Sequence, residues 1–479
     1  MRLGQTTVVF FLGKLGASLF GFLATVYFAR VLGSGVLGVY FLAVGVVSWL
    51  LLGSKMGFNS ALTKRLSERG ERIPYISAGI LLSTFFYLFW AVTVFAFRTP
   101  LNEYFGEPIY QFVLLMLLAR ILFGFVNAII KGKHLVHFLG VQKFLGTFFR
   151  AIFQVILVYF GFKLVGMIVG YAAAFFAVAL LGVAILIRYS DQQLSPVLPE
   201  HQHFRSLFNY AKFSWMGRLE ARTYSWTDIV VLGIFVPSNL IGIYGVCWTL
   251  SSVMILFGDA ISQTMFPEVS EVSSKEGYQK VAGYLNDSLA YAGLITIPGL
   301  VGASILGRGV LNIYGDEFSE GYLILVLLIG AVLLHSYQKQ FLNVLNAVDR
   351  PDLSFRVNSV FVAVNLLLNF VLVYRYGWIG AAVATLVSSL IGAGLAHRAA
   401  SSVLDFGLPL SRIGKQTFAA VMMGCVVYSL VFTYQFLNVS PQELAPTLVA
   451  VGVGAGVYFF LLTVVSSDFR RVVRNNTPK

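Results

Sequence analysis

Four of the cations that lie inside long apolar stretches of the chain are candidates for chemistry: Lys14, Lys55, Arg218 and Arg222. A bare charge in hydrocarbon costs from about 2.5 to more than 10 kcal/mol, so such residues must line a watery cavity or pair with an opposite charge. Arg218 and Arg222 are four residues apart, which places them on one face of a helix. Guanidinium groups bind phosphate through two parallel hydrogen bonds. The pattern therefore predicts an anion site, and a phosphate group is its expected ligand.

Cations outnumber acids within the apolar stretches. Nine Lys and Arg residues fall there against four acids, which are Glu220, Asp228, Asp259 and Asp287. Snorkelling to the headgroups explains three of the nine, which lie near segment ends: Lys143, Arg308 and Lys339. Lys14, Lys55, Arg218 and Arg222 either bound a central cavity or form buried structural ion pairs.

Two parts of the sequence read as one motif written twice. Phe11-Leu-Gly-Lys-Leu-Gly-Ala17 matches Trp215-Met-Gly-Arg-Leu-Glu-Ala221, and at the same offset of 204 positions Ser34–Tyr40 matches Ser238–Tyr244. The offset also pairs Lys14 with Arg218, and Lys55 with Asp259. Lys55 and Asp259 therefore occupy equivalent points and could pair across a pseudo-twofold axis. Duplicated halves with charges at their interface are typical of secondary transporters.

The composition predicts an all-α polytopic membrane protein. Apolar residues make up 58% of the 479 residues, charged residues 11%, and the mean hydropathy is +0.80. Fourteen stretches are long enough to cross a bilayer, which takes about 20 residues. They are 6–29, 36–58, 75–97, 108–130, 139–161, 164–187, 208–236, 239–266, 280–311, 320–345, 355–374, 378–398, 413–437 and 445–466.

These stretches divide into two six-helix lobes and a C-terminal pair. We expect an N-terminal lobe over 1–190, a cytoplasmic connector over 191–207 and a second lobe over 208–400. Two additional transmembrane helices and a basic cytoplasmic tail follow over 401–479. Six spans separate the repeats, so both lobes insert in the same orientation, related by a pseudo-twofold axis along the membrane normal.

The distribution of Lys and Arg predicts the orientation. With both termini cytoplasmic, the inner segments carry 21 of these residues and the outer segments four: Arg30, Arg98, Lys163 and Arg375. This asymmetry is the positive-inside pattern of a protein of the cell membrane. The net charge of +13 is spread over short loops, with no basic patch that would suit nucleic acid.

Signatures of enzyme chemistry are missing from the sequence. Gly414-Lys-Gln416 lacks both the upstream glycine and the hydroxyl residue of a phosphate-binding loop. The His and Cys residues have no metal-binding spacing. We therefore expect no catalytic activity, no metal and no cofactor.

Several motifs resemble the polysaccharide exporters of the multidrug/oligosaccharidyl-lipid/polysaccharide flippase superfamily. Phe28-Ala-Arg-Val-Leu-Gly33 leads into Gly38-Val-Tyr40, and Asp228-Ile-Val-Val-Leu-Gly233 comes before Gly242-Ile-Tyr244. The later matches are Asn343-Val-Leu-Asn346 before Arg350-Pro351, then Asn365, Asn369 and Tyr376-Gly-Trp-Ile-Gly-Ala-Ala-Val-Ala-Thr385. Fourteen spans fit the branch that handles polysaccharides and lipid-linked glycans.

The resemblance implies a V-shaped pair of lobes that opens a cationic cavity alternately to each side of the membrane. The substrate it implies is a glycan on a polyprenyl phosphate or pyrophosphate. The family's basic residues in spans 1, 2 and 7 correspond to Lys14, Lys55, Arg218 and Arg222. The family's cation-binding acids match only Asp228, Asp259 and Asp287, which the resemblance makes candidates for gating or ion coupling. Glycosyltransferases of the same pathway are candidate partners, for polysaccharide or glycoprotein biosynthesis at the cell surface.

Three alternatives stay open at this point. A drug/cation antiporter of the same superfamily would carry acids on the inner face of span 1, where this chain has Lys14. A membrane-embedded glycosyltransferase or ligase would need catalytic groups in a large aqueous loop. An assembly scaffold that transports nothing would tolerate neutral residues at Lys14 and Arg218.

The predicted topology can be tested by cysteine labelling at Glu317 and Glu443, which lie in loops free of cations. We expect an impermeant thiol reagent to modify Glu317→Cys and Glu443→Cys in intact cells. Labelling of either position only after the cells are opened would overturn the orientation.

Overall fold

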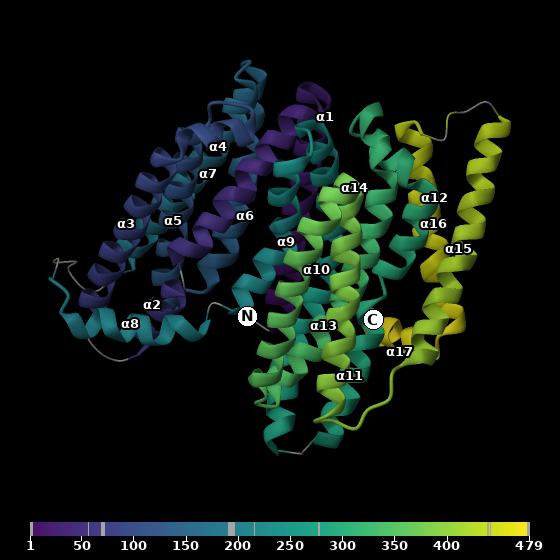
Figure 1. The fold of residues 1–479 in the computed structure, drawn as a ribbon. Helices are drawn as coiled ribbons and strands as arrows, with labels where there is room; N and C mark the ends of the chain where they lie inside the picture. The colour runs from purple at the N-terminus through teal and green to yellow at the C-terminus, as the bar shows by residue number, and fades with distance from the viewer. Residues whose placement is uncertain are drawn as a thin grey trace. The chain divides into compact units, whose positions relative to one another are not determined.

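Every element that the structure describes is a helix (Figure 1). The computed structural model describes residues 3–55, 57–68, 72–189, 197–214, 216–275, 278–437, 440 and 442–476. Side chains are described in these ranges except at 3–19, 72, 212–214, 216–217, 256–257, 259–268, 270–275, 278–279 and 472–476. The absence of strands from the described residues confirms the predicted all-α class.

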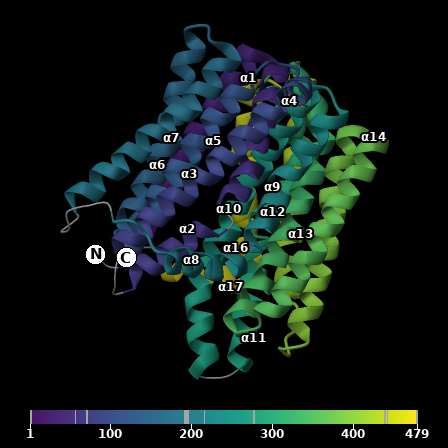
Figure 2. The same ribbon diagram turned by 60° about the vertical axis from the view of Figure 1, so that its left-hand side comes forward.

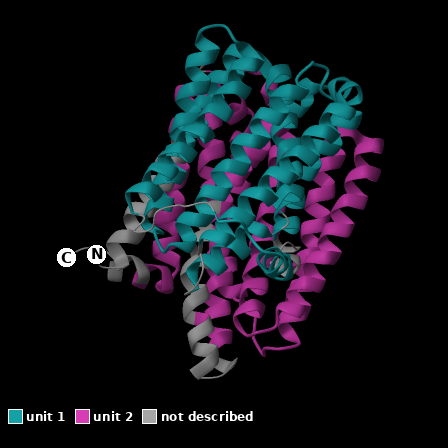
Figure 3. Ribbon diagram, turned by 90° about the vertical axis from the view of Figure 1, so that its left-hand side faces the viewer, with its two compact units in different colours: residues 1–242 teal, residues 243–479 magenta. Residues whose placement is uncertain are grey.

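Contacts divide the chain into two compact units, unit 1 over residues 1–242 and unit 2 over residues 243–479 (Figure 3). Unit 1 holds α1 (Leu3–Lys55), α2 (Phe58–Ser67), α3 (Arg72–Ala96), α4 (Arg98–Phe105), α5 (Tyr110–Gly132), α6 (His137–Tyr159), α7 (Lys163–Arg188), α8 (His201–Ser214), α9 (Met216–Phe235) and the start of α10 (Ser238–Lys275). Unit 2 holds the rest of α10, then α11 (Tyr278–Ala292), α12 (Thr296–Asn312), the 3-10 helix η1 (Asp316–Gly321), α13 (Tyr322–Ala347), α14 (Pro351–Ser401), α15 (Leu410–Phe436), α16 (Leu444–Val465) and α17 (Ser467–Asn476).

Eleven helical segments in the described ranges are long and apolar enough to cross a membrane. Two of them, in α1 and α14, are bent at Gly33 (φ 76°) and Gly377 (φ 58°), where a positive φ favours glycine. Each of these helices has more than 50 residues, which at about 1.5 Å per residue is long enough for two crossings. The charged helix α9 is not one of these eleven segments. Two crossings each for α1 and α14, together with α9, are compatible with the predicted fourteen.

Unit 1 is built around α5. This helix packs against α1, α2, α3 and α7, and the aligned α3, α5, α6 and α7 can be followed in Figure 2. Leu62 and Leu66 of α2 pack with Ile129 and Ile130 of α5 in the core of the unit. Outward-facing positions of α3 are apolar and exposed, as expected of a helix in contact with lipid.

The predicted seventh span, 208–236, is two helices instead of one. The first, α8, begins at His201, within the predicted connector, and packs across α2 and α3. Its buried side is formed by His203, Leu207 and Ala211, while Arg205 and Asn209 are exposed. Such a one-sided pattern is that of an amphipathic helix at a surface, which hydropathy alone does not separate from a span.

Repeat-equivalent residues meet where α1 crosses the first turn of α10. A methyl group on Gly38 would overlap the carbonyl oxygen of Ser238, and one on Gly242 would overlap the carbonyl oxygen of Ser34. These four residues form two pairs at the offset of 204 positions. Because each glycine receives the serine of the other copy, the contact is reciprocal, as a local twofold relation requires.

Alanine at Gly38 or at Gly242 should therefore push the two backbones apart. We expect each variant to lose about 1–3 kcal/mol of stability, the usual cost of overpacking. The control is Gly35→Ala, whose new methyl group would lie 3.9 Å from Ser238 Oγ, an ordinary contact. Thermal unfolding of purified protein measures the difference, and equal midpoints for all three variants would contradict the close crossing.

Unit 2 contains a break inside a membrane helix. Residues 293–295 separate α11 from α12, in the middle of the predicted span 280–311. Gln416 of α15 donates to the carbonyl of Ala290 (2.6 Å), and Tyr458 of α16 donates to the carbonyl of Leu294 (2.9 Å). Backbone groups released by such a break need partners in lipid. The two additional C-terminal helices supply them.

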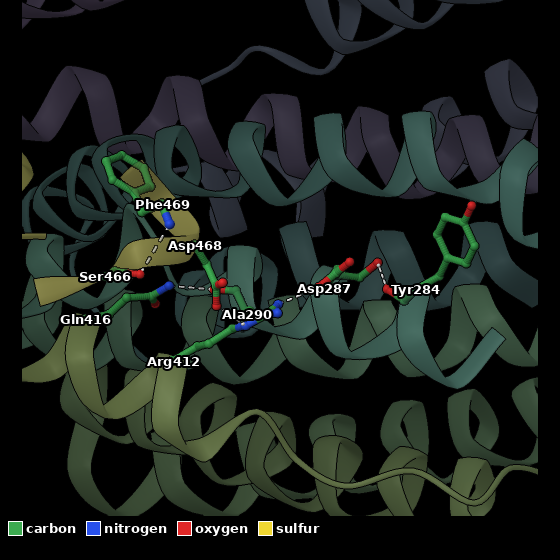
Figure 4. A network of polar contacts seen from close by, with 9 residues as sticks. Tyr284, Asp287, Ala290, Arg412, Gln416, Ser466, Asp468 and Phe469 are labelled. Atoms are coloured by element: carbon green, nitrogen blue, oxygen red, sulfur yellow. Dashed lines mark hydrogen bonds and ion pairs between the residues drawn. The ribbon is translucent and has the colours of Figure 1, made fainter. Parts of the chain in front are cut away.

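An ion-pair network adjoins the break (Figure 4). Arg412 of α15 lies 2.5 Å from Asp287 of α11 and 3.1 Å from Asp468 of α17. All three side chains are more than one-third exposed. Solvent screening therefore limits the contribution of this network to stability. The buried hydrogen bonds of Gln416 and Tyr458 are the stronger attachment of α15 and α16 to α11 and α12.

Removal of the Gln416 amide tests this attachment. We expect Gln416→Leu to lose about 0.6–1.7 kcal/mol, the range found for hydrogen bonds between membrane helices. The matched control is Thr417→Val, because Thr417 is exposed and bonds only to Ile413 of its own helix. Thermal unfolding in detergent provides the comparison. A Gln416→Leu midpoint equal to that of Thr417→Val would mean that the break needs no partner.

Candidate functional site

The site begins where α1 ends. Lys55 is the last residue of α1, and Gly57 turns the chain into α2 with φ 88°, a left-handed conformation that favours glycine. Asn59 and Ser60 of the first turn of α2 follow directly. A lysine and two polar side chains are thereby gathered at one sharp turn of the membrane region.

Four cations from three helices surround this turn. Lys55 of α1 is within electrostatic range of Arg120 in α5 and of Arg218 and Arg222 in α9. Arg222 in turn interacts with Arg120 and Arg218. The Arg218 guanidinium donates to the hydroxyl of Ser60, which ties α9 to α2. All of these side chains lie in unit 1, and we call Lys55, Arg120, Arg218 and Arg222 the cation cluster.

No carboxylate offsets this charge among the side chains that the structure describes. None of the four members has an acidic oxygen within 4 Å in those ranges, and the charged groups that act on Lys55 are all cations. Each side chain is half-buried. Cations inside a membrane region face the interior of the helix bundle or a water-filled cavity. The cluster can therefore hold an anion with several oxygen atoms, and phosphate suits it best.

Two acids lie in α9 as well, Glu220 between the two arginines and Asp228 beyond them. Asp228 is 4% exposed and interacts with Tyr224, which also interacts with Glu220. Thr223 and Thr227 are buried beside them in sequence. This polar stretch follows Arg222 and continues α9 toward its end at Phe235. Asp228 is therefore buried in a polar stretch of the helix that carries the two site arginines.

The structure brings together three of the four predicted phosphate ligands, Lys55, Arg218 and Arg222. The side chain of the fourth, Lys14, lies outside those described, and so does that of Asp259. The pairing of Lys55 with Asp259 stays a prediction. Asp287 contacts Arg412 in unit 2.

Arg120 was not predicted as a site residue. Its signal in the sequence is that it is the one charged residue between Tyr110 and Ile130. Nothing in the sequence tells which neighbouring helix it faces. No group of three or more His, Cys, Asp or Glu in the described part of the chain is arranged to hold a metal.

A family model described as "Polysaccharide biosynthesis protein" matches residues 3–273, more than half of the chain. The chain belongs to this family. The match spans the whole of unit 1 that the structure describes, including the cation cluster. The resemblance predicted from the sequence motifs is thus confirmed.

Two relatives align with most of this chain. A "Probable flippase AglR" of Haloferax volcanii is 29% identical over 99% of this chain and 98% of its own length. A "Probable low-salt glycan biosynthesis flippase Agl15" of the same organism is 27% identical over 89% of this chain and 90% of its own.

Solved structures share the fold. The lipid II flippase MurJ in an inward closed conformation aligns with a TM-score of 0.79 at 16% identity, over 98% of this chain and 100% of that one. An inward-facing multidrug resistance transporter of the MATE family aligns with a TM-score of 0.62 at 14% identity, over 81% and 95%. This protein is therefore a multi-pass membrane protein with the fold of these transporters.

Proposed function

We propose that the protein is a flippase that moves a glycan, linked to a polyprenyl phosphate or pyrophosphate, from the cytoplasmic to the outer leaflet of the cell membrane. The observation that carries this proposal is the cation cluster without a carboxylate partner in the described ranges. The names of the two Haloferax relatives support the substrate class. Both termini would be cytoplasmic, as the distribution of Lys and Arg predicts.

The chemistry of the substrate explains why a protein is needed. Each polar group of a sugar that is stripped of water costs on the order of 1–3 kcal/mol, so the glycan cannot cross hydrocarbon unaided. A polar cavity that is open to the bilayer at its side removes this cost, while the polyprenyl chain stays in lipid. The cluster supplies positive charge to the phosphate and orients the head of the substrate.

Transport of this kind needs no covalent step. With the cytoplasm negative, each negative charge moved outward gains about 2.3 kcal/mol per 100 mV. Asp228, Asp259 and Asp287 are our candidates for gating or ion coupling. Glycosyltransferases that build the lipid-linked glycan on the cytoplasmic leaflet would supply the substrate.

A drug/cation antiporter is the competing function, because multidrug transporters share the fold. The cluster disfavours it. Lys55, Arg218 and Arg222 would repel a cationic drug. An anionic substrate experiences the opposite force.

Neutralising the cluster should separate a substrate site from a structural one. We expect Lys55→Ala and Arg218→Ala to reduce transport about tenfold or more, the loss of a charge-assisted hydrogen bond. Arg218→Lys keeps the charge without the planar guanidinium and should lose less. The measurement is the lipid-linked glycan that accumulates on the cytoplasmic leaflet.

Stability provides the second readout. Removing Lys55, one of four mutually repelling cations, should leave the thermal midpoint unchanged or raise it. Breaking a buried ion pair would instead cost about 3–5 kcal/mol of stability and lower the midpoint. Lys143→Gln, which removes an exposed cation of α6, is the control for charge alone. Normal transport in an Arg218→Ala, Lys55→Ala double variant would contradict the proposed phosphate site. A collapse in stability would assign these residues a structural role.

A further inference from the structure

We infer that α5 forms one wall of the phosphate site, with Gly124 as the positioning residue that seats the Lys55 ammonium and Arg120 as a further phosphate ligand. The inference rests on the proposed function, because it concerns the same site. The inference adds α5 to the site, because the four predicted phosphate-binding residues lie in α1 and α9. Gly124 and Arg120 are four residues apart, so they lie on one face of α5.

Gly124 makes the space in which the Lys55 side chain ends. A methyl group on Gly124 would overlap Lys55 Nζ, would lie 2.8 Å from Lys55 Cε and would lie 3.1 Å from Asn59 Nδ2. These are the three heavy atoms nearest to the added group. The ammonium therefore lies directly against the backbone of α5, at a point where any side chain would displace it.

Alanine at Gly124 should displace the Lys55 side chain without disturbing the fold. The atoms that alanine would meet are the ends of two flexible polar side chains, Lys55 and Asn59, and no backbone atom is among them. Both side chains can move without any shift of α1, α2 or α5. Alanine thus changes where the charge of Lys55 lies and little else, which makes Gly124 a probe of position instead of stability.

Arg120 is held by aromatic rings of α5 and α7. Its guanidinium carbon lies 4.4 Å from the centre of the Phe175 ring and 6.0 Å from that of Phe123. Phe175 also packs against Tyr171, whose ring centre is 4.8 Å away. Stacking on a ring restrains a guanidinium while its N–H edges stay free to donate. Arg120 is thereby oriented before any anion arrives, next to Arg222.

The ligand class is a phosphate group, carried on an isoprenoid lipid or free in solution. Farnesyl phosphate and inorganic phosphate serve as the two probes. Binding of each to purified full-length protein in nanodiscs is measured by titration. Tight binding of farnesyl phosphate with weak binding of inorganic phosphate identifies a lipid headgroup as the ligand, and equal binding identifies the free anion.

The decisive comparison is a double-mutant cycle between Gly124 and Lys55. We expect Gly124→Ala to raise the Kd for farnesyl phosphate about tenfold, as Lys55→Gln does, with the thermal midpoint unchanged. Adding Gly124→Ala to Lys55→Gln should change the Kd less than about twofold, because the ammonium is already absent. The control is Gly21→Ala, since a methyl group there meets no atom within 4 Å.

Arg120 is tested in parallel. Arg120→Gln should raise the Kd about tenfold, and Phe175→Leu should raise it by a smaller factor that vanishes in the Arg120→Gln background. Lys143→Gln controls for the loss of one positive charge.

The outcomes distinguish a failure of the phosphate site from a failure of the wall formed by α5. If Lys55→Gln and Arg218→Ala bind farnesyl phosphate normally, the phosphate site itself is wrong. If those two variants are impaired but Gly124→Ala binds like Gly21→Ala, only the wall formed by α5 is wrong. The positioning role is also overturned if Gly124→Ala weakens binding as strongly in the Lys55→Gln background as alone.

Discussion

Repulsion among like charges is the constraint on which the rest of unit 1 depends. Two unit charges about 8 Å apart repel by about 2 kcal/mol at an effective dielectric of about 20, and the cluster contains four. The fold must hold α1, α5 and α9 together against this force. It does so through the apolar packing of α5 on α2 and through the bond from Arg218 to Ser60. A bound anion would relieve this repulsion, so the ligand that we propose would stabilise the arrangement.

Much of this arrangement could be predicted from the sequence, since charge inside an apolar segment stands out against its surroundings. Lys55, Arg218 and Arg222 were identified in this way, and the structure brings them together. The repeat likewise predicted that Ser34 and Ser238 occupy equivalent places, and the reciprocal contact of their carbonyls with Gly242 and Gly38 supports that equivalence. Both signals are carried by residue type and by spacing along the chain.

What could not be predicted depends on which helices pack together. Arg120 stands alone in its span, and no periodicity indicates that it faces α9. Gly124 is one of 46 glycines, and its use is visible only when Lys55 lies against it. The split between α8 and α9 was not predicted, because Phe208, Tyr210 and Ala211 give the start of the predicted span the residue types of a crossing helix. These features depend on tertiary contacts between helices, and the local pattern of a single sequence does not show which helices will be in contact.

The origin of the cluster in three separate helices gives the proposed transport a physical basis. A ligand shifts a conformational equilibrium only by the difference in its affinity for the two states. The anion binds best when Lys55, Arg120 and the arginines of α9 converge, and a movement that parts α9 from α1 and α5 disperses their charge. Such a movement weakens the hold on the phosphate while it restores the separation that the bare cations favour. Binding therefore stabilises the converged state, and loss of the anion favours the dispersed one.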